Sequence, residues 1–396
     1  MNNIMNNNPQ EYKICSRGIW DTTVPGITFD ENSVSNYAKM FDKLCEVYPR
    51  GEKGKKYWEN IVDQTKEKGK NKKYDCIIGV SGGTDSSYLL HIAKKEYGLR
   101  PLAVNMDNGW SSEIAVQNIK KVTKALDIDL ETYVIDYEEV KAVLRAYMKA
   151  SLPWVDGPTD NAIKSIIFSL AEREGIQYVL TGSDFRSEGK QPSEWTYTDS
   201  RQMLFLLKKF EKINLKTYPF QSLFNIVNST IIKKIKDYRP FNSINYQKKI
   251  AQEFLKKEYD WEYYGGHHHE NVFTKFSIAY WMPRKFGIDK RIITFSAQIL
   301  SGEMKREDAL EKMKHPPYDT DQMERDKEFV TKKLDLSNEG FNRIWNQENR
   351  HYWDYPSYMP IFNKYFKLSN TFLRYFFPTP PTIIIERQTR RNESSN

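Results

Sequence analysis

The stretch that most constrains this chain is residues 75–97, DCIIGVSGGTDSSYLLHIAKKEY. It begins with an apolar, β-branched run at residues 76–80, which suits a strand that is buried on both faces. Two adjacent glycines follow and allow a sharp turn, with no Cβ between the backbone amides and a ligand. Apolar residues then recur at helical spacing, and the free N–H groups of a first helical turn form an anion site. An ordinary βα turn with a capping residue would explain one hydroxyl side chain but not three around one Asp.

Residues 81–86 read SGGTDS and match every fixed position of SGG-x-DS, the signature of the PP-loop ATP pyrophosphatases, which this stretch resembles. The resemblance implies that ATP is the cofactor and that the loop cradles its pyrophosphate. The residues that it places around the nucleotide are Ser81, Gly82, Gly83, Thr84, Asp85, Ser86 and Ser87. The other phosphate-loop signature, GxxxxGK[ST], is absent from the sequence, which disfavours kinase-like transfer of the γ-phosphate.

Four strand-like runs, at residues 76–80, 102–106, 132–135 and 178–181, alternate with helical patterns near 86–97, 112–126 and 138–175. This alternation predicts an α/β fold with a doubly wound parallel sheet, followed by a mostly helical C-terminal region. Such sheets bind ligands where the strand order reverses, so we expect the first and fourth strands to be neighbours. Polar residues gather where the strands end, and those that we assign to the nucleotide site are Asp107, Thr181, Gly182 and Ser183.

Residues 21–31 read DTTVPGITFDE, which resembles the D-T-T-x-P-x-I-x-F-D-E segment of the N-acetyl sugar amidotransferases of the WbpG/PseA type. In that family two Cys-x-x-Cys pairs flank the segment. This chain keeps Cys15 but has Gly18, Ser35 and Ala38 at the other three positions. One thiolate cannot make a structural zinc site, which needs about four ligands, so we expect no zinc. Packing must then hold the segment, with the apolar anchors Trp20, Ile27 and Phe29.

Residues 265–276 resemble the G-G-x-H-H-E-x-x-F-T-x-F motif of the same amidotransferases, and residues 285–291 resemble their K-F-G-x-D-K-R. The resemblance makes His268, His269 and Glu270 candidates for substrate contact or proton transfer. A metal site is disfavoured here, because adjacent side chains do not share a helix face and H-E-x-x-H is absent from the sequence.

The third crossover, near residues 138–175, is broken by Pro153 and Pro158. Residues 158–163 read PTDNAI, and in the sugar amidotransferases a similar P-T-D-x-A-I lies by the nucleotide site. This resemblance suggests a direct role for Thr159 and Asp160. The alternative is that Asp160 only caps a helix that starts near Asn161.

The resemblance implies an ATP-dependent enzyme that converts the acetamido group of an N-acetyl sugar, nucleotide-linked or acidic, into an acetamidino group for surface polysaccharide or glycan synthesis. Adenylation would activate the amide oxygen, and ammonia would displace AMP from the imidate. We expect ATP and Mg²⁺ as cofactors, with Asp85 as the carboxylate ligand of Mg²⁺. Two alternatives stay open: a tRNA-modifying PP-loop enzyme, which the net charge of +8 would suit, and a non-catalytic nucleotide-binding protein.

Three cysteines in 396 residues are typical of a reducing cytoplasm, and no apolar stretch is long enough to cross a membrane. None of these cysteines lies in a glycine elbow or directly after Met1, where glutaminase nucleophiles are found. We therefore expect a cytoplasmic chain with no membrane or nucleic-acid partner. Ammonia would come from a separate glutaminase subunit with a synthase-like barrel partner, as the family resemblance suggests, docked on the basic stretch 208–257.

The sequence divides into four predicted regions. Residues 1–70 form an N-terminal segment and linker, with residues 51–74 as a solvated helix and linker, and residues 71–200 form the PP-loop domain. Residues 201–345 form a helical region for substrate or partner, and residues 346–396 form a C-terminal tail.

Overall fold

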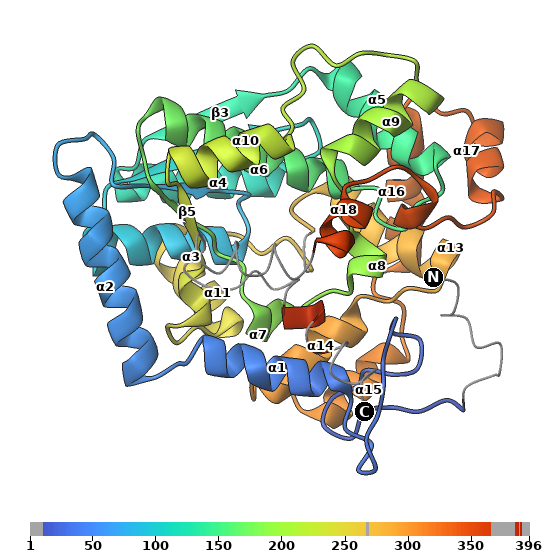
Figure 1. Ribbon diagram of the computed structural model, residues 1–396, viewed down its shortest axis with the longest axis horizontal. Coiled ribbons are helices and arrows are strands. Elements are labelled where there is room, and N and C mark those ends of the chain that lie inside the picture. Colours follow the sequence, from blue (N-terminus) through green and yellow to red (C-terminus); the bar gives the residue numbers. More distant parts are fainter. Residues whose placement is uncertain (1–10, 267–268, 366–384, 388, 390–396) are drawn as a thin grey trace.

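The structure is a computed structural model, and it describes residues 11–266, 269–365, 385–387 and 389. At its centre lies a parallel sheet of five strands in the order β3-β2-β1-β4-β5 (Figure 1). The strands are β1 Cys76–Gly79, β2 Pro101–Asp107, β3 Leu130–Val134, β4 Tyr178–Leu180 and β5 Lys236–Tyr238. The predicted fold class is confirmed, and so is the expectation that the first and fourth strands are neighbours, which places the reversal of strand order between β1 and β4.

Side chains of the central strands alternate between two apolar layers. Ile77 and Val104 face the layer that includes α5 (Tyr137–Lys149) and α6 (Gly157–Arg173). Ile78 and Ala103 face the other layer, formed by three helices: α3 Thr84–His91, α4 Glu113–Leu126 and α11 Lys248–Tyr259. Because both faces are covered, the strands read in the sequence as continuous apolar runs.

Two expectations about the limits of the regions need correction. The sheet takes its fifth strand, β5, from residues 236–238, so the division at residue 200 cuts through the sheet. The helix expected to be solvated, α2 (Glu52–Gly69), buries Trp58, Ile61 and Val62 in the second apolar layer, so it belongs to the core. The sequence analysis did not predict β5, because this strand is only three residues long, KDY, and two of them are charged.

The chain after β4 is mainly helical and wraps the carboxyl ends of the strands (Figure 1). No helix in the described ranges is both long enough and apolar enough to cross a membrane. The other α-helices are α1 Asn36–Val47, α7 Phe185–Glu188, α8 Ser193–Thr196, α9 Ser200–Phe210, α10 Leu223–Val227, α12 Val272–Phe276, α13 Met282–Phe286, α14 Arg291–Leu300, α15 Arg306–Met313, α16 Thr320–Lys333, α17 Asn338–Trp345 and α18 Met359–Lys364. Shorter π and 3₁₀ segments are η1 Ile92–Glu96, η2 Asn228–Ile232, η3 Pro240–Asn242, η4 Ser277–Trp281 and η5 Tyr352–Asp354.

The N-terminal segment is held by packing and by hydrogen bonds to the C-terminal helices. Trp20 and Ile27 are buried, and Phe29 is half-buried against them. The Arg306 Nε donates to the Gly18 carbonyl at 3.0 Å, and the Ile19 amide donates to the Ser296 Oγ at 2.9 Å. The sulfur of Cys15 is buried and accepts a hydrogen bond from the backbone amide of Ser35, at 3.3 Å.

If packing rather than a metal holds this segment, Trp20→Ala should lower the free energy of unfolding by about 3–5 kcal/mol, because Trp20 is 3% exposed. The matched control is Trp353→Ala, since Trp353 is 51% exposed and should cost far less. Urea unfolding measures both. One zinc per chain by elemental analysis of the purified protein would contradict this account.

Candidate functional site

The turn after β1 is set by the conformation of Gly82. This residue has φ +79°, and a Cβ built on it would lie 2.2 Å from the carbonyl oxygen of Ala115 in α4. The Gly82 carbonyl accepts hydrogen bonds from Trp261 Nε1 at 3.0 Å and from Asn118 Nδ2 at 3.3 Å. The turn is therefore clamped between α4 and the segment that follows α11.

The first turn of α3 offers backbone amides to the space above the sheet. Gly83 occupies the N-cap position without a side-chain cap, and the first helical bond joins the Ser87 amide to the Gly83 carbonyl at 3.1 Å. The amides of Asp85 and Ser86 come before that bond in the chain, so they have no acceptor within the helix. Ser81 Oγ accepts from the Gly83 amide, and Ser86 Oγ accepts from the Ser81 amide, each at 3.3 Å. This geometry suits an anion, because fixed dipoles point toward one spot.

The turn after β4 closes against this loop. A Cβ built on Gly182 would lie 2.8 Å from the carbonyl carbon of Asp85, so the two backbones touch. Thr181 Oγ1 donates to Asp237 Oδ1 at 2.7 Å, which ties the turn to β5. The predicted neighbourhood of the two glycine turns is therefore confirmed.

A cavity of about 450 Å³ opens at the carboxyl ends of β1, β2 and β4. Ten of the predicted site residues line it: Ser81, Gly83, Asp85, Ser86, Thr159, Asp160, Thr181, Gly182, Ser183 and Glu270. Three others lie behind the loop, namely Gly82, Thr84 and Ser87, all of them buried. Their contribution to the site is to shape the turn.

Asp107 does not lie where the sequence placed it. Among the described residues, β2 contributes Val104, Asn105 and Met106 to the cavity. Asp107 lies beyond them, is exposed, and accepts a hydrogen bond from the amide of Gly109 at 2.9 Å. Its carboxylate therefore stabilises its own turn, which corrects the prediction of a nucleotide contact.

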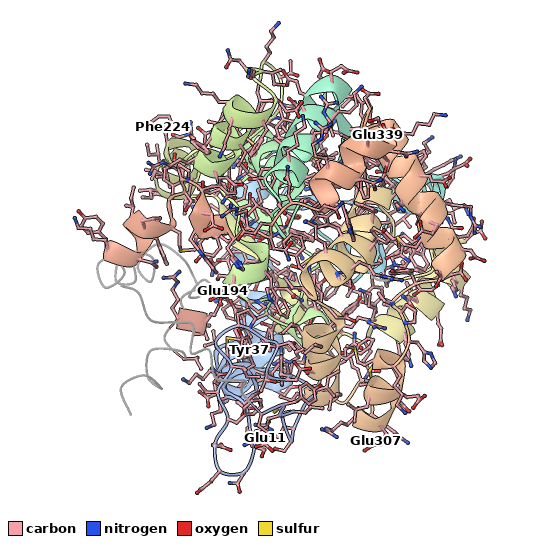
Figure 2. The ribbon with its side chains drawn as sticks, turned by 90° about the vertical axis from the view of Figure 1, so that its right-hand side faces the viewer. Glu11, Tyr37, Glu194, Phe224, Glu307 and Glu339 are labelled. Carbon is pink, nitrogen blue, oxygen red and sulfur yellow. The ribbon has the colours of Figure 1, made fainter. Side chains whose placement is uncertain are left out.

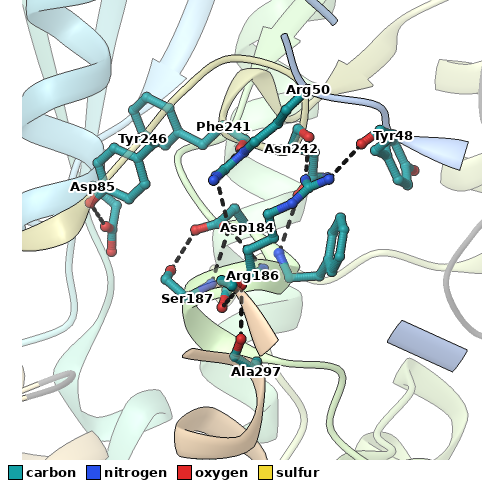
Figure 3. A network of polar contacts seen from close by, with 12 residues as sticks. Tyr48, Arg50, Asp85, Asp184, Arg186, Ser187, Phe241, Asn242, Tyr246 and Ala297 are labelled. Carbon is teal, nitrogen blue, oxygen red and sulfur yellow. Dashed lines mark hydrogen bonds and ion pairs between the residues drawn. The ribbon is translucent and has the colours of Figure 1, made fainter. Parts of the chain in front are cut away.

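Both carboxylate oxygens of Asp85 have protein partners. Tyr246 donates its phenol hydrogen to Oδ1 (Figure 3), and Lys248 Nζ lies 2.8 Å from Oδ2. Burial opposes the charge of Lys248, but Asp85 and Glu188 outweigh burial and raise the pKa of this lysine above its ordinary value. A role for Asp85 as a ligand of Mg²⁺ stays a prediction, and it requires Asp85 to share its oxygens with these partners.

Behind the loop lies a buried polar network that Figure 3 shows from close by. Asp184 accepts hydrogen bonds from the amides of Arg186 and Ser187 and so caps α7. The guanidinium of Arg186 donates to the carbonyls of Asn242 at 2.5 Å and Tyr48 at 2.7 Å. Burial raises the pKa of Asp184. The network joins the turn after β4 to η3, which follows β5, and to the end of α1, and we assign it a structural role.

Glu270 approaches the loop from the C-terminal region. Ser81 Oγ donates to its Oε1 at 3.4 Å, and its backbone carbonyl accepts from Ser112 at 2.8 Å. The ring of His269 lies over Gly266, where a Cβ would meet it at 2.3 Å, and His269 is not among the described residues that line the cavity. The third candidate, His268, lies outside the described residues.

The position where α6 starts excludes one alternative for Asp160, namely that it only caps a helix starting near Asn161. The helix begins at Gly157 with Asp156 in the N-cap position, not near Asn161. Asp160 lies in the first turn of the helix, and its Oδ2 accepts a hydrogen bond from Trp154 Nε1 at 3.1 Å. Its carboxylate thus faces the cavity together with Thr159.

Lys290 is a cavity residue to which the sequence gave no role. Its Nζ lies 4.1 Å from the centroid of the Trp154 ring. Burial lowers the pKa of Lys290 below its ordinary value, although Asp160, Glu188 and Asp156 oppose this shift. The only available signal was its place in the KFGIDKR stretch, which says nothing of where the side chain points.

Two family models match the chain. Residues 270–369 match the model described as LPS biosynthesis protein WbpG-like, C-terminal domain. Residues 57–190 match the model described as NAD synthase. An uncharacterised protein of Methanocaldococcus jannaschii is 30% identical over 139 residues, which are 34% of this chain and 47% of that protein. The match therefore spans about half the length of that relative.

Solved structures give weaker similarities. The NH₃-dependent NAD synthetase from Campylobacter jejuni is 14% identical, with coverage of 79% of this chain and 97% of that chain and a TM-score of 0.29. The U34-tRNA thiolase NcsA from Methanococcus maripaludis is 10% identical, with coverage of 79% and 80% and a TM-score of 0.31. Similarities at this level carry no argument about function.

The tight turn gives a prediction with a matched control. Gly82→Ala adds a Cβ at φ +79° that collides with the Ala115 carbonyl, whereas Gly302→Ala adds one at φ +76° with nothing within 4 Å. Both should lose about 1 kcal/mol from backbone strain, and Gly82→Ala should lose a further 1–3 kcal/mol from overpacking. Urea unfolding measures the difference, and equal losses would show that the turn has room to move.

Proposed function

Because this chain is a WbpG-type member of the PP-loop ATP pyrophosphatase family, we propose that it uses ATP to convert the acetamido group of an N-acetyl sugar into an acetamidino group. A nucleotide-linked or acidic sugar of surface polysaccharide or glycan synthesis is the proposed substrate. The printed description of the C-terminal match, an LPS biosynthesis protein, supports that choice.

One observation carries the proposal: the two matched regions line one cavity. The loop residues Ser81 and Ser86 come from the NAD synthase-type region, and Glu270, Thr274 and Lys290 come from the WbpG-like region. A nucleotide on the loop and a substrate held by the second region would therefore meet in about 450 Å³. Two reactants held in one site gain the rate advantage of an intramolecular reaction.

The chemistry needs two displacements. The amide oxygen attacks the α-phosphorus of ATP, a P–O bond forms, and pyrophosphate leaves. Ammonia then attacks the imidate carbon, the C–O bond breaks, and AMP leaves with the former amide oxygen. The nitrogen of ammonia remains on carbon and loses protons to solvent, which gives an amidine.

The loop would stabilise the first displacement. Negative charge builds up on the pyrophosphate as it leaves, and the amides of Asp85 and Ser86 offer fixed donors to it, with the side chains of Ser81 and Ser86 in the same cavity lining. The backbones of the two glycine turns touch, so these donors do not have to reorganise during the reaction.

The residues present fit a magnesium ion. Five carboxylates line the described part of the cavity against a single lysine, so a bound nucleotide needs further positive charge. Mg²⁺ typically takes one or two carboxylates together with phosphate oxygens and water. No group of three acidic, His or Cys side chains in the described ranges is arranged to hold a metal ion, so Asp85 with at most one further carboxylate of the lining, such as Glu270, would hold it together with the phosphates. When bound, the ion neutralises phosphate charge.

Lys290 supplies the one cationic side chain of the described cavity lining. The Trp154 ring holds its ammonium group, and carboxylates on α6 lie nearby. Its proposed role is to donate hydrogen bonds to the α-phosphate, whose charge increases in both displacements. Glu270 would serve substrate contact or metal binding, in keeping with its hydrogen bond to the loop.

Ammonia would come from a separate glutaminase subunit with a synthase-like barrel partner. A glutaminase needs an activated thiolate, and the thiols of this chain argue against one. Cys15 and Cys76 are fully buried, and burial raises the pKa of Cys45 and Cys76.

The central prediction concerns products. The purified chain with ATP, Mg²⁺, ammonium chloride and candidate N-acetyl sugars should release AMP and pyrophosphate and lower the sugar mass by about one unit, as O is replaced by NH. Glutamine in place of ammonium should give no product. Release of ADP and phosphate would contradict the loop assignment, and product from glutamine alone would contradict the separate subunit.

Co-purifying RNA without sugar turnover would favour the tRNA alternative, and ATP binding without turnover on any sugar would favour a non-catalytic protein.

Lys290→Met should lower kcat about 100-fold, because it removes a positioned donor to developing charge while keeping the apolar length of the side chain. The control is Lys120→Met on exposed α4 surface, which should leave kcat unchanged. Steady-state assays with circular dichroism of both variants provide the comparison. An unchanged kcat in folded Lys290→Met would remove this residue from the mechanism.

A further inference from the structure

The ten residues of α10 and η2, 223–232, turn their apolar side away from the protein. Their polar side faces inward: Asn228 Nδ2 donates to Glu172 Oε2 at 3.2 Å, and Ser229 Oγ donates to Glu172 Oε1 at 2.5 Å. A surface helix of a globular protein normally buries its apolar side instead. The exposed residues, which we call the α10 patch, are Leu223, Phe224, Ile226, Val227 and Ile232.

The patch projects from the molecule rather than lining a groove. Phe224 is 76% exposed and Ile232 is 64% exposed. Figure 2 shows Phe224 at the outer edge of the molecule. Large apolar side chains that stand out at such a tip mark an interaction surface.

The charged residues of the segment that carries the patch are all of one sign. Residues 212–236 contain no Asp or Glu and five lysines: Lys212, Lys216, Lys233, Lys234 and Lys236. Lys233 and Lys234 directly follow the patch and are exposed. A second copy of this chain is a poor occupant, because a symmetric contact would bring these lysines against one another. The partner that binds the patch must offer both an apolar region into which its side chains can insert and negative charge for the lysines.

We propose that the α10 patch docks this chain on the surface of an anionic membrane. The acyl region of one leaflet would accept Phe224 and its neighbours, and lipid phosphates would pair with the flanking lysines. A lipid surface supplies both properties at once and accepts a projecting tip without a matching groove. This differs from the sequence-based expectation of no membrane partner, which rested on the absence of a spanning segment.

The stretch 208–257, expected to dock a protein partner, is not one surface. Its first part, the end of α9, packs into the apolar layer of α5 and α6, whereas α11 packs into the opposite layer. The patch itself is fastened to α6, because the Gln221 amide donates to Asn161 Oδ1 at 2.8 Å. Since α6 also carries Thr159 and Asp160, docking would hold the cavity within about one helix length, roughly 25 Å, of the lipid.

The test is co-sedimentation of the full chain with vesicles of phosphatidylglycerol and phosphatidylethanolamine, compared with vesicles of phosphatidylcholine alone. We expect binding to the anionic vesicles that weakens as salt is added. Phe224→Ser should weaken binding more than about tenfold, because it removes a large inserted side chain. Lys233→Ala and Lys234→Ala should each weaken it about fivefold.

The matched control is Ile250→Ser, since Ile250 is 57% exposed on α11, in the opposite layer, and should leave vesicle binding unchanged. Turnover in solution should be the same in all four variants, which shows that they fold. Absence of binding to anionic vesicles, or an equal loss in Ile250→Ser, would overturn the proposal. A protein cross-linked through a photoreactive residue at position 224, with no vesicle binding, would assign the patch to a protein partner instead.

Discussion

The rest of the structure depends on the backbone contact between Gly82 and Ala115. Because the turn after β1 lies against α4 with no room for a Cβ, the amides at the start of α3 have one position. Trp261 and Asn118 hold the carbonyl of the same glycine, and Trp261 comes from a segment about 180 residues further along the chain. The C-terminal region therefore shapes the nucleotide loop directly.

The charges that line the cavity suit a polyanion only when a cation is bound with it. The loop amides and Lys290 favour negative charge, whereas the surrounding carboxylates oppose it until a cation arrives. Lys248 and Tyr246 each hold one carboxylate oxygen of Asp85 and so stabilise the base of the loop. ATP and its metal ion would therefore be expected to bind together.

Sequence reasoning reached the fold class, four of the five strands, and ten of the residues that line the cavity, because strand runs and a glycine turn are local patterns. It missed β5 because the strand is three residues long, with two charges, and is specified by pairing with β4. It misplaced Asp107 because the sequence cannot tell which residues of a strand end turn into the cavity. Of its two alternatives for Asp160, the one that made it a helix cap placed the start of α6 four residues too late, since Asp156 occupies the cap position.

The sequence by itself determined the chemistry of the loop, because SGGTDS fixes which donors and which backbone freedom follow β1. Only the tertiary structure decided what faces that loop. Glu270 and Lys290 lie about 190 and 210 residues from Ser81, and the wrapping of the C-terminal helices brings them to the same cavity. The outward turn of the α10 patch was likewise invisible in the sequence, because the direction of a helix face is set by what its polar side binds, here Glu172.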